Sequence, residues 1–244
     1  MSDTENRGMI VVMARLARVV VPGLPHHVTQ RGNRRAPIFL VAGDERIYLR
    51  ILREQIDHHG VEIWAYCLMP NHVHMIATPQ DEGGLSKAFG EAHRRYTAHI
   101  NKRQAWTGHL FQARFASVVM DETHLLTAAR YIALNPVRAR LVARAGDWPW
   151  SSVGAHLAGR DDHLVSVAPL LSRIDRFADT LECDLPDETF SALRAAETTG
   201  RPLGSDAFIA GLEARLNRQL RPRRPGRKPQ IRGQLTHFSS RAPG

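Results

Sequence analysis

The sequence has few cysteines, a deficit of acidic residues and no long apolar run. Its cysteines, Cys67 and Cys183, show no spacing typical of a zinc knuckle or a disulfide framework, which fits a reducing cytoplasm. The apolar stretch at residues 9–13 is too short to span a membrane and lacks an obvious signal-peptide cleavage site. We therefore expect a cytoplasmic protein with no membrane partner, and residues 1–13 to be disordered or a misassigned start.

The deficit of acid leaves 33 Lys and Arg against 24 Asp and Glu, a net charge of +9, which favours a polyanionic partner, nucleic acid first. Between residues 215 and 232 there are eight basic residues and no acid. Residues 221–244, rich in Pro, Gly and Arg, are predicted to form a disordered basic tail that tethers DNA. Outside the charged stretch the chain is close to neutral, so binding there must rely on local basic clusters.

Apolar periodicity predicts the element order β-α-β-β-α-β followed by a third helix. This order is typical of the ferredoxin-like split βαβ fold, an α+β sandwich with an antiparallel sheet. We expect helices on one face of that sheet and a free second face for a ligand. The predicted strands cover residues 26–32, 61–68, 71–78 and 114–120, and the predicted helices cover 44–59, 85–103 and 121–134.

Two histidines separated by one residue open the third predicted strand. Side chains two apart on a strand share a face, so His72 and His74 can direct their imidazoles at one metal ion. On the following helix Tyr131 and Asn135 lie four residues apart. Pro136 is expected to end that helix, placing the Asn135 carboxamide at its C-terminus, where the partial negative charge favours a cation.

These side chains together could cleave a phosphodiester. Two neutral imidazoles and the amide oxygen of Asn135 would bind Mg²⁺ or Mn²⁺ and leave positions for water and phosphate oxygens. Tyr131 could then attack phosphorus, giving a phosphotyrosyl link and a free 3′-hydroxyl. Tyr96, in a basic helix, is the rival nucleophile, but it has no carboxamide four residues on.

Six segments of the chain match a known family in the same order. The chain resembles the HUH single-strand nucleases, specifically the IS200/IS605-type single-tyrosine transposases and, among them, the REP-associated tyrosine transposases. The segments are HVTQRGNRR (27–35), YCLMPNHVHMIATP (66–79), RRYTAHIN (94–101), GHLFQARF (108–115), RYIALNPVRA (130–139) and WPWSS (148–152).

The resemblance implies that His72 and His74 are the metal-binding pair, Tyr131 the nucleophile and Asn135 the third ligand. The mobile-element enzymes usually carry glutamine at that third position, and asparagine fits the REP-associated branch. The resemblance covers roughly residues 14–155, where we expect the catalytic domain, and it implies an association with the bacterial nucleoid. The residue pattern after it predicts a helical extension at 156–220. Candidate DNA contacts are Arg31, Arg34, Arg35, Arg94, Arg95 and Arg114.

We therefore predict a metal-dependent single-stranded DNA endonuclease and strand transferase acting beside hairpins such as extragenic palindromes. Two alternatives stay open: a regulator that binds hairpin DNA or structured RNA without cutting, and a hydrolase that uses water while Tyr131 is structural. The sequence leaves open a monomer or a homodimer, the recognised hairpin, and whether the protein still moves DNA.

Overall fold

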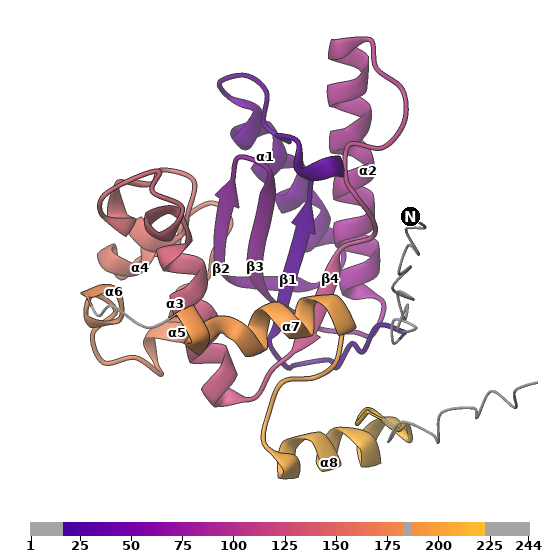
Figure 1. The fold of residues 1–244 in the computed structure, drawn as a ribbon, viewed down its shortest axis with the longest axis vertical. Helices are drawn as coiled ribbons and strands as arrows, with labels where there is room; N and C mark the ends of the chain where they lie inside the picture. Colours follow the sequence, from indigo (N-terminus) through magenta and orange to yellow (C-terminus); the bar gives the residue numbers. More distant parts are fainter. Residues whose placement is uncertain (1–16, 183–186, 223–244) are drawn as a thin grey trace, which may run out of the picture.

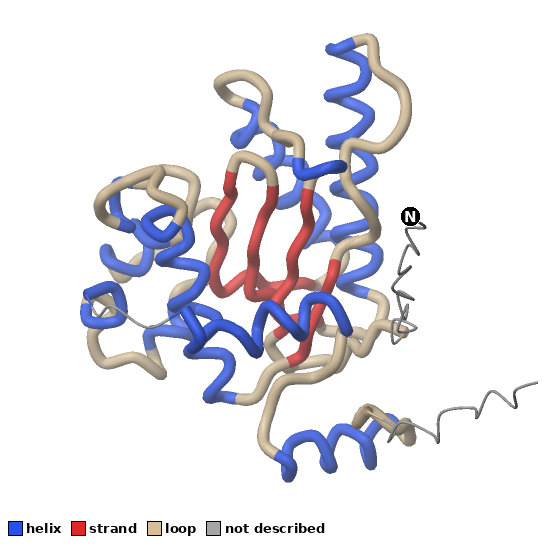
Figure 2. The backbone as a smooth tube through the Cα atoms, viewed as in Figure 1, coloured by secondary structure: helices blue, strands red, loops and turns tan. Residues whose placement is uncertain are grey.

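A four-stranded antiparallel sheet with the order β2-β3-β1-β4 lies at the centre of the molecule (Figures 1 and 2). The computed structural model describes residues 17–182 and 187–222. The order along the chain, β1-α1-β2-β3-α2-β4-α3, confirms the α+β ferredoxin-like prediction. The elements are β1 (His26–Arg31), α1 (Asp44–His58), β2 (Val61–Met69), β3 (His72–Pro79), α2 (Gly84–Gln104), β4 (Ala116–Val119) and α3 (Glu122–Arg138).

Helices α1 and α2 cover one face of the sheet and enclose the larger core. Val28, Ile63 and Met75 point from the strands into this layer, where they meet apolar side chains such as Leu52 and Phe89. All five side chains are fully buried. The apolar stripes read from the sequence therefore face the sheet, as the periodicity predicts.

The second face of the sheet is also covered, so the expectation of helices on one face only is wrong. Helix α3 packs there, and α7 (Ser191–Thr199) crosses the same side of the sheet in Figures 1 and 2. Trp64 and Ile76 of the sheet meet Ile132 of α3 and Leu193 of α7 in a second core. Strand β2 is buried at eight of its nine positions, which requires cover on both faces.

The β2–β3 hairpin fixes the position of the paired histidines. A tight turn at Pro70-Asn71 connects Met69 to His72, which face each other in the antiparallel register. In the neighbouring pair, Thr29 of β1 lies opposite His74 and Arg31 opposite His72. His27, two residues before Thr29, shares their face because side chains alternate along a strand.

Helix α3 begins as predicted and ends later than predicted. Asp121 caps it by accepting a hydrogen bond from the backbone N–H of His124. The helix continues through Pro136 to Arg138, so the predicted end at Leu134 is wrong. A proline near the end of a helix removes a single N–H···O bond, and the carbonyl of Asn135 still accepts from the N–H of Ala139.

The chain after α3 packs back onto the same cores. The indole of Trp148 donates to the carbonyl of Leu68, which confirms that the WPWSS segment (148–152) returns to the sheet. The division of the chain into a domain at 14–155 and an extension at 156–220 stays a prediction, as do the calls on Cys183 and the tail from residue 223, which lie outside the described residues. The remaining helices are η1 (Asn33–Arg35), η2 (Ala145–Asp147), α4 (Val153–Ala158), α5 (Ala168–Leu171), α6 (Asp179–Glu182), η3 (Asp187–Phe190) and α8 (Asp206–Leu216).

Candidate metal centre and nucleophile

Three histidines from β1 and β3 gather on the sheet face that α3 and α7 cover. The ring centroids of His72 and His74 lie 4.9 Å apart, and those of His27 and His74 lie 5.2 Å apart. His27 and His74 are buried, whereas His72 is partly exposed. The strand alternation that predicts a shared face for His72 and His74 therefore also brings in His27 from the neighbouring strand.

Tyr131 of α3 reaches this histidine group. The edge of its ring faces His74 at a centroid distance of 5.3 Å and His27 at 6.2 Å. Its other neighbours are Phe190, at 5.2 Å, and the guanidinium of Arg138, which lies 5.2 Å from the ring centroid. The side chain predicted as nucleophile and the paired histidines, far apart in the sequence, are thus adjacent in the structure.

Asn135 lies one helical turn after Tyr131, on the same buried side of α3. It is 8% exposed, and its amide nitrogen has no hydrogen-bond partner among the described residues. A buried amide nitrogen without a hydrogen-bond partner is uncommon in folded proteins. The role of Asn135 as a third metal ligand stays a prediction.

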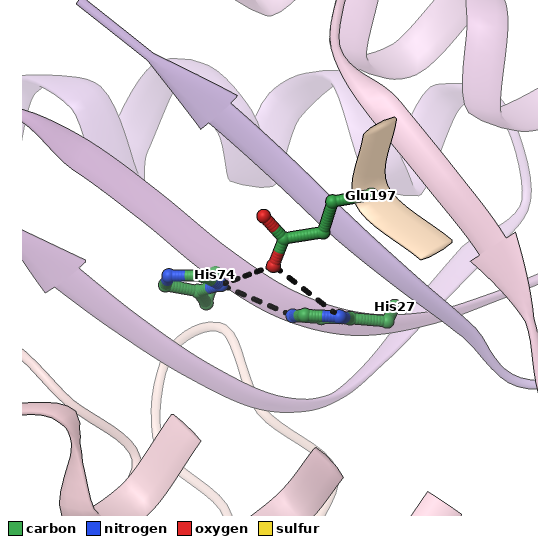
Figure 3. Close-up of side chains that lie close together, drawn as sticks. All are labelled: His27, His74 and Glu197. Atoms are coloured by element: carbon green, nitrogen blue, oxygen red, sulfur yellow. Dashed lines mark hydrogen bonds and ion pairs between the residues drawn. The ribbon is translucent and has the colours of Figure 1, made fainter. Parts of the chain in front are cut away.

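Glu197 of α7 is a member of the group that the sequence did not indicate (Figure 3). Its carboxylate oxygen Oε1 lies 3.9 Å from Nδ1 of His27 and 3.9 Å from Nδ1 of His74. His27 and His74 contact each other directly, with Nε2 of His27 3.0 Å from Nδ1 of His74. One nitrogen or oxygen from each of the three side chains lies within 4.8 Å of the other two.

Burial sets the charge state of these groups. It lowers the pKa of His27 and of His72 to about 4, and that of His74 well below its usual value. The nearby charge of Arg31 adds to the shift at His72 and at His74. The imidazoles are therefore neutral at neutral pH, which is the state that binds a metal. Burial raises the pKa of Glu197 to about 7, against the opposing effect of Arg31 and Arg194.

Tyr131 experiences opposing electrostatic effects. Burial raises the pKa of its phenol, and the charge of Glu197 raises it further. The guanidinium groups of Arg138 and Arg194 lower it. These two arginines are therefore the groups of the chain that favour a phenolate at this position.

The donor set fits a divalent cation. Nε2 of His74 is buried without a hydrogen-bond partner among the described residues. Nδ1 of His72 lies 2.6 Å from the carboxamide oxygen of Asn71, which can only accept, so Nδ1 carries the proton and Nε2 is left with its lone pair. Neutral imidazole nitrogens together with amide or carboxylate oxygens suit Mg²⁺ or Mn²⁺, with imidazole favouring the transition metal.

A cavity of about 280 Å³ opens beside the histidines. His72, His74 and Glu197 line one side of it, and the two predicted DNA contacts Arg31 and Arg114 lie on its wall. Both arginines are exposed to solvent. Positive charge therefore surrounds the opening of the candidate metal centre.

The other predicted DNA contacts lie further from the histidines. Arg34 and Arg35 are exposed in η1, whose backbone is joined to the β2–β3 turn because Asn71 donates to the carbonyl of Arg35. Arg94 lines a second cavity, of about 560 Å³, together with Arg114. Arg95, like Arg94, forms an ion pair with Glu91 on the solvent side of α2.

Tyr96 does not qualify as a nucleophile. It is fully buried in the core between α1, α2 and the sheet, and its hydroxyl donates to the carbonyl of Ile38 at 2.8 Å. Burial raises its pKa far above the usual value. His124 is also accounted for locally, because it pairs with the capping residue Asp121 at 2.7 Å.

Comparison with known proteins gives a family match for part of the chain. Residues 20–135 match the family model described as the IS200-like transposases. The resemblance to this transposase family that the motifs gave is confirmed over residues 20–135.

Two similar proteins are named as REP-associated tyrosine transposases. A Haemophilus influenzae protein named as a candidate REP-associated tyrosine transposase is 23% identical over 111 residues, which cover 41% of this chain and 63% of that protein. The fold matches a solved structure of a REP-associated tyrosine transposase bound to a REP hairpin, with a TM-score of 0.53 and 21% identity. That match covers 63% of this chain and 92% of the solved one.

Within residues 17–182 and 187–222, none of the helices combines the length and the apolar character needed to cross a membrane.

Proposed function

We propose that this protein is a metal-dependent endonuclease and strand transferase that acts on single-stranded DNA beside a hairpin. The observation that carries the proposal is the 5.3 Å approach of the Tyr131 ring to His74, which itself lies 4.9 Å from His72. A phenol beside two neutral imidazoles that can hold a metal ion suits metal-assisted attack of tyrosine on a phosphodiester. The hairpin is proposed because a relative of the same fold is described as bound to one.

His72, His74 and Asn135 would hold the ion, for which Mg²⁺ and Mn²⁺ are the candidates. When bound, the ion supplies positive charge that polarises the scissile phosphate. The neutral state of the imidazoles preserves that charge for the substrate. The neighbouring cavity, with Arg31 and Arg114 on its wall, has the charge needed to receive the phosphate backbone.

Tyr131 would carry out the covalent step. Its phenol loses a proton to solvent, with Arg138 and Arg194 favouring the resulting phenolate. The phenolate oxygen then forms a bond to phosphorus while the bond from phosphorus to the 3′ oxygen breaks, and that oxygen takes up a proton. The product is a 5′-phosphotyrosyl strand and a free 3′-hydroxyl. Because the phosphotyrosyl link is still a diester, the 3′-hydroxyl of another strand can displace Tyr131 and complete strand transfer without a nucleotide cofactor.

A hairpin-binding regulator that does not cut is the second candidate. The observation that favours it is the burial of Tyr131, which is 8% exposed and is not among the residues that line the cavity. In that case the arginines around the opening would bind DNA or structured RNA and Tyr131 would serve the packing of α3.

The test uses labelled oligonucleotides that carry a hairpin with a single-stranded flank, incubated with Mn²⁺ and separated under denaturing conditions. The proposal expects a protein–DNA complex that survives denaturation, and its loss in Tyr131→Phe with hairpin binding retained. Binding without cleavage in the unmodified protein would support the regulator instead. Cleavage that persists in Tyr131→Phe would indicate water as the nucleophile.

A further inference from the structure

The two ring nitrogens of His74 have different surroundings. Nδ1 lies 3.0 Å from Nε2 of His27, whereas Nε2 is buried and has no hydrogen-bond partner among the described residues. On its other side His27 presents Nδ1 to Oε1 of Glu197, at 3.9 Å. Figure 3 shows the two imidazole rings side by side and the carboxylate above them, with one of its oxygens facing both rings.

A neutral imidazole carries one N–H and one lone pair, so the contact between the two rings allows two arrangements. In the first, His74 donates from Nδ1 to Nε2 of His27. His27 then carries its proton on Nδ1, facing the carboxylate of Glu197, and Nε2 of His74 presents a lone pair.

In the second arrangement His27 donates from Nε2 to Nδ1 of His74. His74 then carries a buried N–H on Nε2 with no acceptor, and the lone pair on Nδ1 of His27 faces the oxygen of Glu197. Each arrangement leaves one buried N–H without a hydrogen bond, because Nδ1 of His27 also has no partner among the described residues. In the first arrangement that N–H faces an acidic oxygen at 3.9 Å, whereas in the second it faces no acceptor and two lone pairs face each other, which costs more free energy. The first arrangement is therefore favoured.

We propose that His27 and Glu197 are positioning residues that fix the tautomer of His74, so that Nε2 is the nitrogen offered to the metal. This inference rests on the proposed metal-dependent function. Metal-binding histidines characteristically donate their other N–H to a protein acceptor, often within a carboxylate-linked series. In its ionised form Glu197, whose Oε1 lies 3.9 Å from Nδ1 of His27 and of His74, favours a proton on both of these nitrogens through its charge, without a hydrogen bond.

The surroundings of His72 independently favour the same tautomer for that residue. Its Nδ1 lies 2.6 Å from the carboxamide oxygen of Asn71, which leaves Nε2 with the lone pair. Two different acceptors, Asn71 and His27, thus impose the same tautomer on the two members of the histidine pair. The inference also explains why a helix from the C-terminal part of the chain, α7, places a carboxylate against the sheet.

The tautomers can be measured directly in the metal-free, unmodified protein. Long-range ¹H–¹⁵N correlation spectra distinguish the protonated nitrogen of each imidazole, and His27→Gln and His72→Gln assist assignment. The inference expects protons on Nδ1 of His27, His72 and His74. A proton on Nε2 of His74 would overturn it.

Metal affinity is the second readout, measured by Mn²⁺ titration with paramagnetic resonance of the free ion. His27→Leu is expected to weaken Mn²⁺ binding by about 10-fold to 100-fold, because the ring of His74 loses its acceptor. In His27→Gln the side-chain oxygen can occupy the position of Nε2 and accept the same proton, so affinity should be largely restored. Glu197→Gln should weaken binding less than His27→Leu, and Ala195→Gln, an exposed change on the same helix, should have no effect.

The outcomes separate this inference from the proposed function. Equal affinity of His27→Leu and the unmodified protein would overturn the inference alone. Loss of Mn²⁺ binding in Glu197→Gln combined with full binding in His72→Ala would also overturn it, because Glu197 would then be a direct ligand. An unmodified protein that binds no Mn²⁺ would overturn both the inference and the metal-dependent function.

Discussion

Each face of the sheet buries tyrosine and histidine side chains, but the two sets differ in how their polar atoms are satisfied. On the face covered by α1 and α2, the hydroxyl of Tyr48 lies 3.0 Å from Nε2 of His93, and Tyr96 donates to a backbone carbonyl. On the face covered by α3 and α7, His74 and Glu197 retain buried atoms without hydrogen-bond partners among the described residues.

The comparison teaches that residue type alone does not identify a site. A buried polar group that meets its partner inside the protein stabilises the fold, whereas one left without a partner carries a free-energy cost unless a ligand satisfies it. The group of Tyr48, His93 and Tyr96 therefore has the character of a core, and the group of His74 and Glu197 that of a site.

The largest expected effect comes from removing a polar group on the second face. His74→Leu should lower cleavage of a hairpin oligonucleotide by at least about 100-fold, because it removes a proposed metal ligand. The thermal midpoint should stay the same or rise, since the substitution replaces a buried imidazole that has an unpaired nitrogen. Calorimetry and a cleavage assay on the same preparation would check both parts. A strongly destabilised variant would show that His74 belongs to the core.

A substitution on the first face should lower the stability of the protein and leave cleavage unchanged. Tyr48→Phe removes the hydroxyl that pairs with His93 and should lower the free energy of unfolding by about 1–3 kcal/mol. Cleavage and Mn²⁺ affinity should not change, because the sheet separates this residue from the histidine group. Urea denaturation measures the first quantity. A loss of cleavage at full stability would end the distinction between the two faces.

The ion pair between Asp44 and Arg103 predicts that the stability of the protein depends on pH. Asp44 is buried, and hydrogen bonds from Arg103 and from two backbone N–H groups outweigh the effect of burial, holding its pKa at about 2. A folded-state pKa below the unfolded value means that this stabilisation is present above about pH 4 and is lost as the pH falls towards 2.

Asp44→Asn should therefore lower the free energy of unfolding by about 2 kcal/mol at pH 7. The difference in unfolding free energy between this variant and the unmodified protein should disappear near pH 2. Unfolding curves across this range would measure it, and a difference that is independent of pH would exclude the ion pair as its source.

The smallest effect is expected at the rim of the cavity. Arg114→Ala should weaken binding of single-stranded DNA and lower the slope of log affinity against log salt by about 0.7, the value for one lost phosphate contact. Arg94→Ala is the matched comparison, because Arg94 already pairs with Glu91 and should change the slope less. Equal effects of the two substitutions would argue against a DNA path centred on the metal site.

Much of this fold could be predicted from local signals. Alternation in β3 gives the shared face of His72 and His74, and the capping residue Asp121 marks the start of α3. The end of α3 could not be predicted from Pro136, because one lost hydrogen bond near a helix end is outweighed by the packing of the helix.

The role of His27 could have been found from the predicted topology. The ferredoxin-like order places β1 beside β3, so a histidine on the matching face of β1 must lie near His74. The run of apolar residues in β2 likewise signalled a sheet covered on both faces. Glu197 could not have been found in this way, because α7 is a nine-residue helix whose position depends on tertiary packing.

The most direct measurement is peptide mapping of the unmodified protein after reaction with a hairpin oligonucleotide and Mn²⁺. Mass spectrometry should find the 5′ end of the cleaved strand linked through phosphate to the peptide that contains Tyr131. A link to any other residue, or cleaved DNA with every peptide unmodified, would contradict the account.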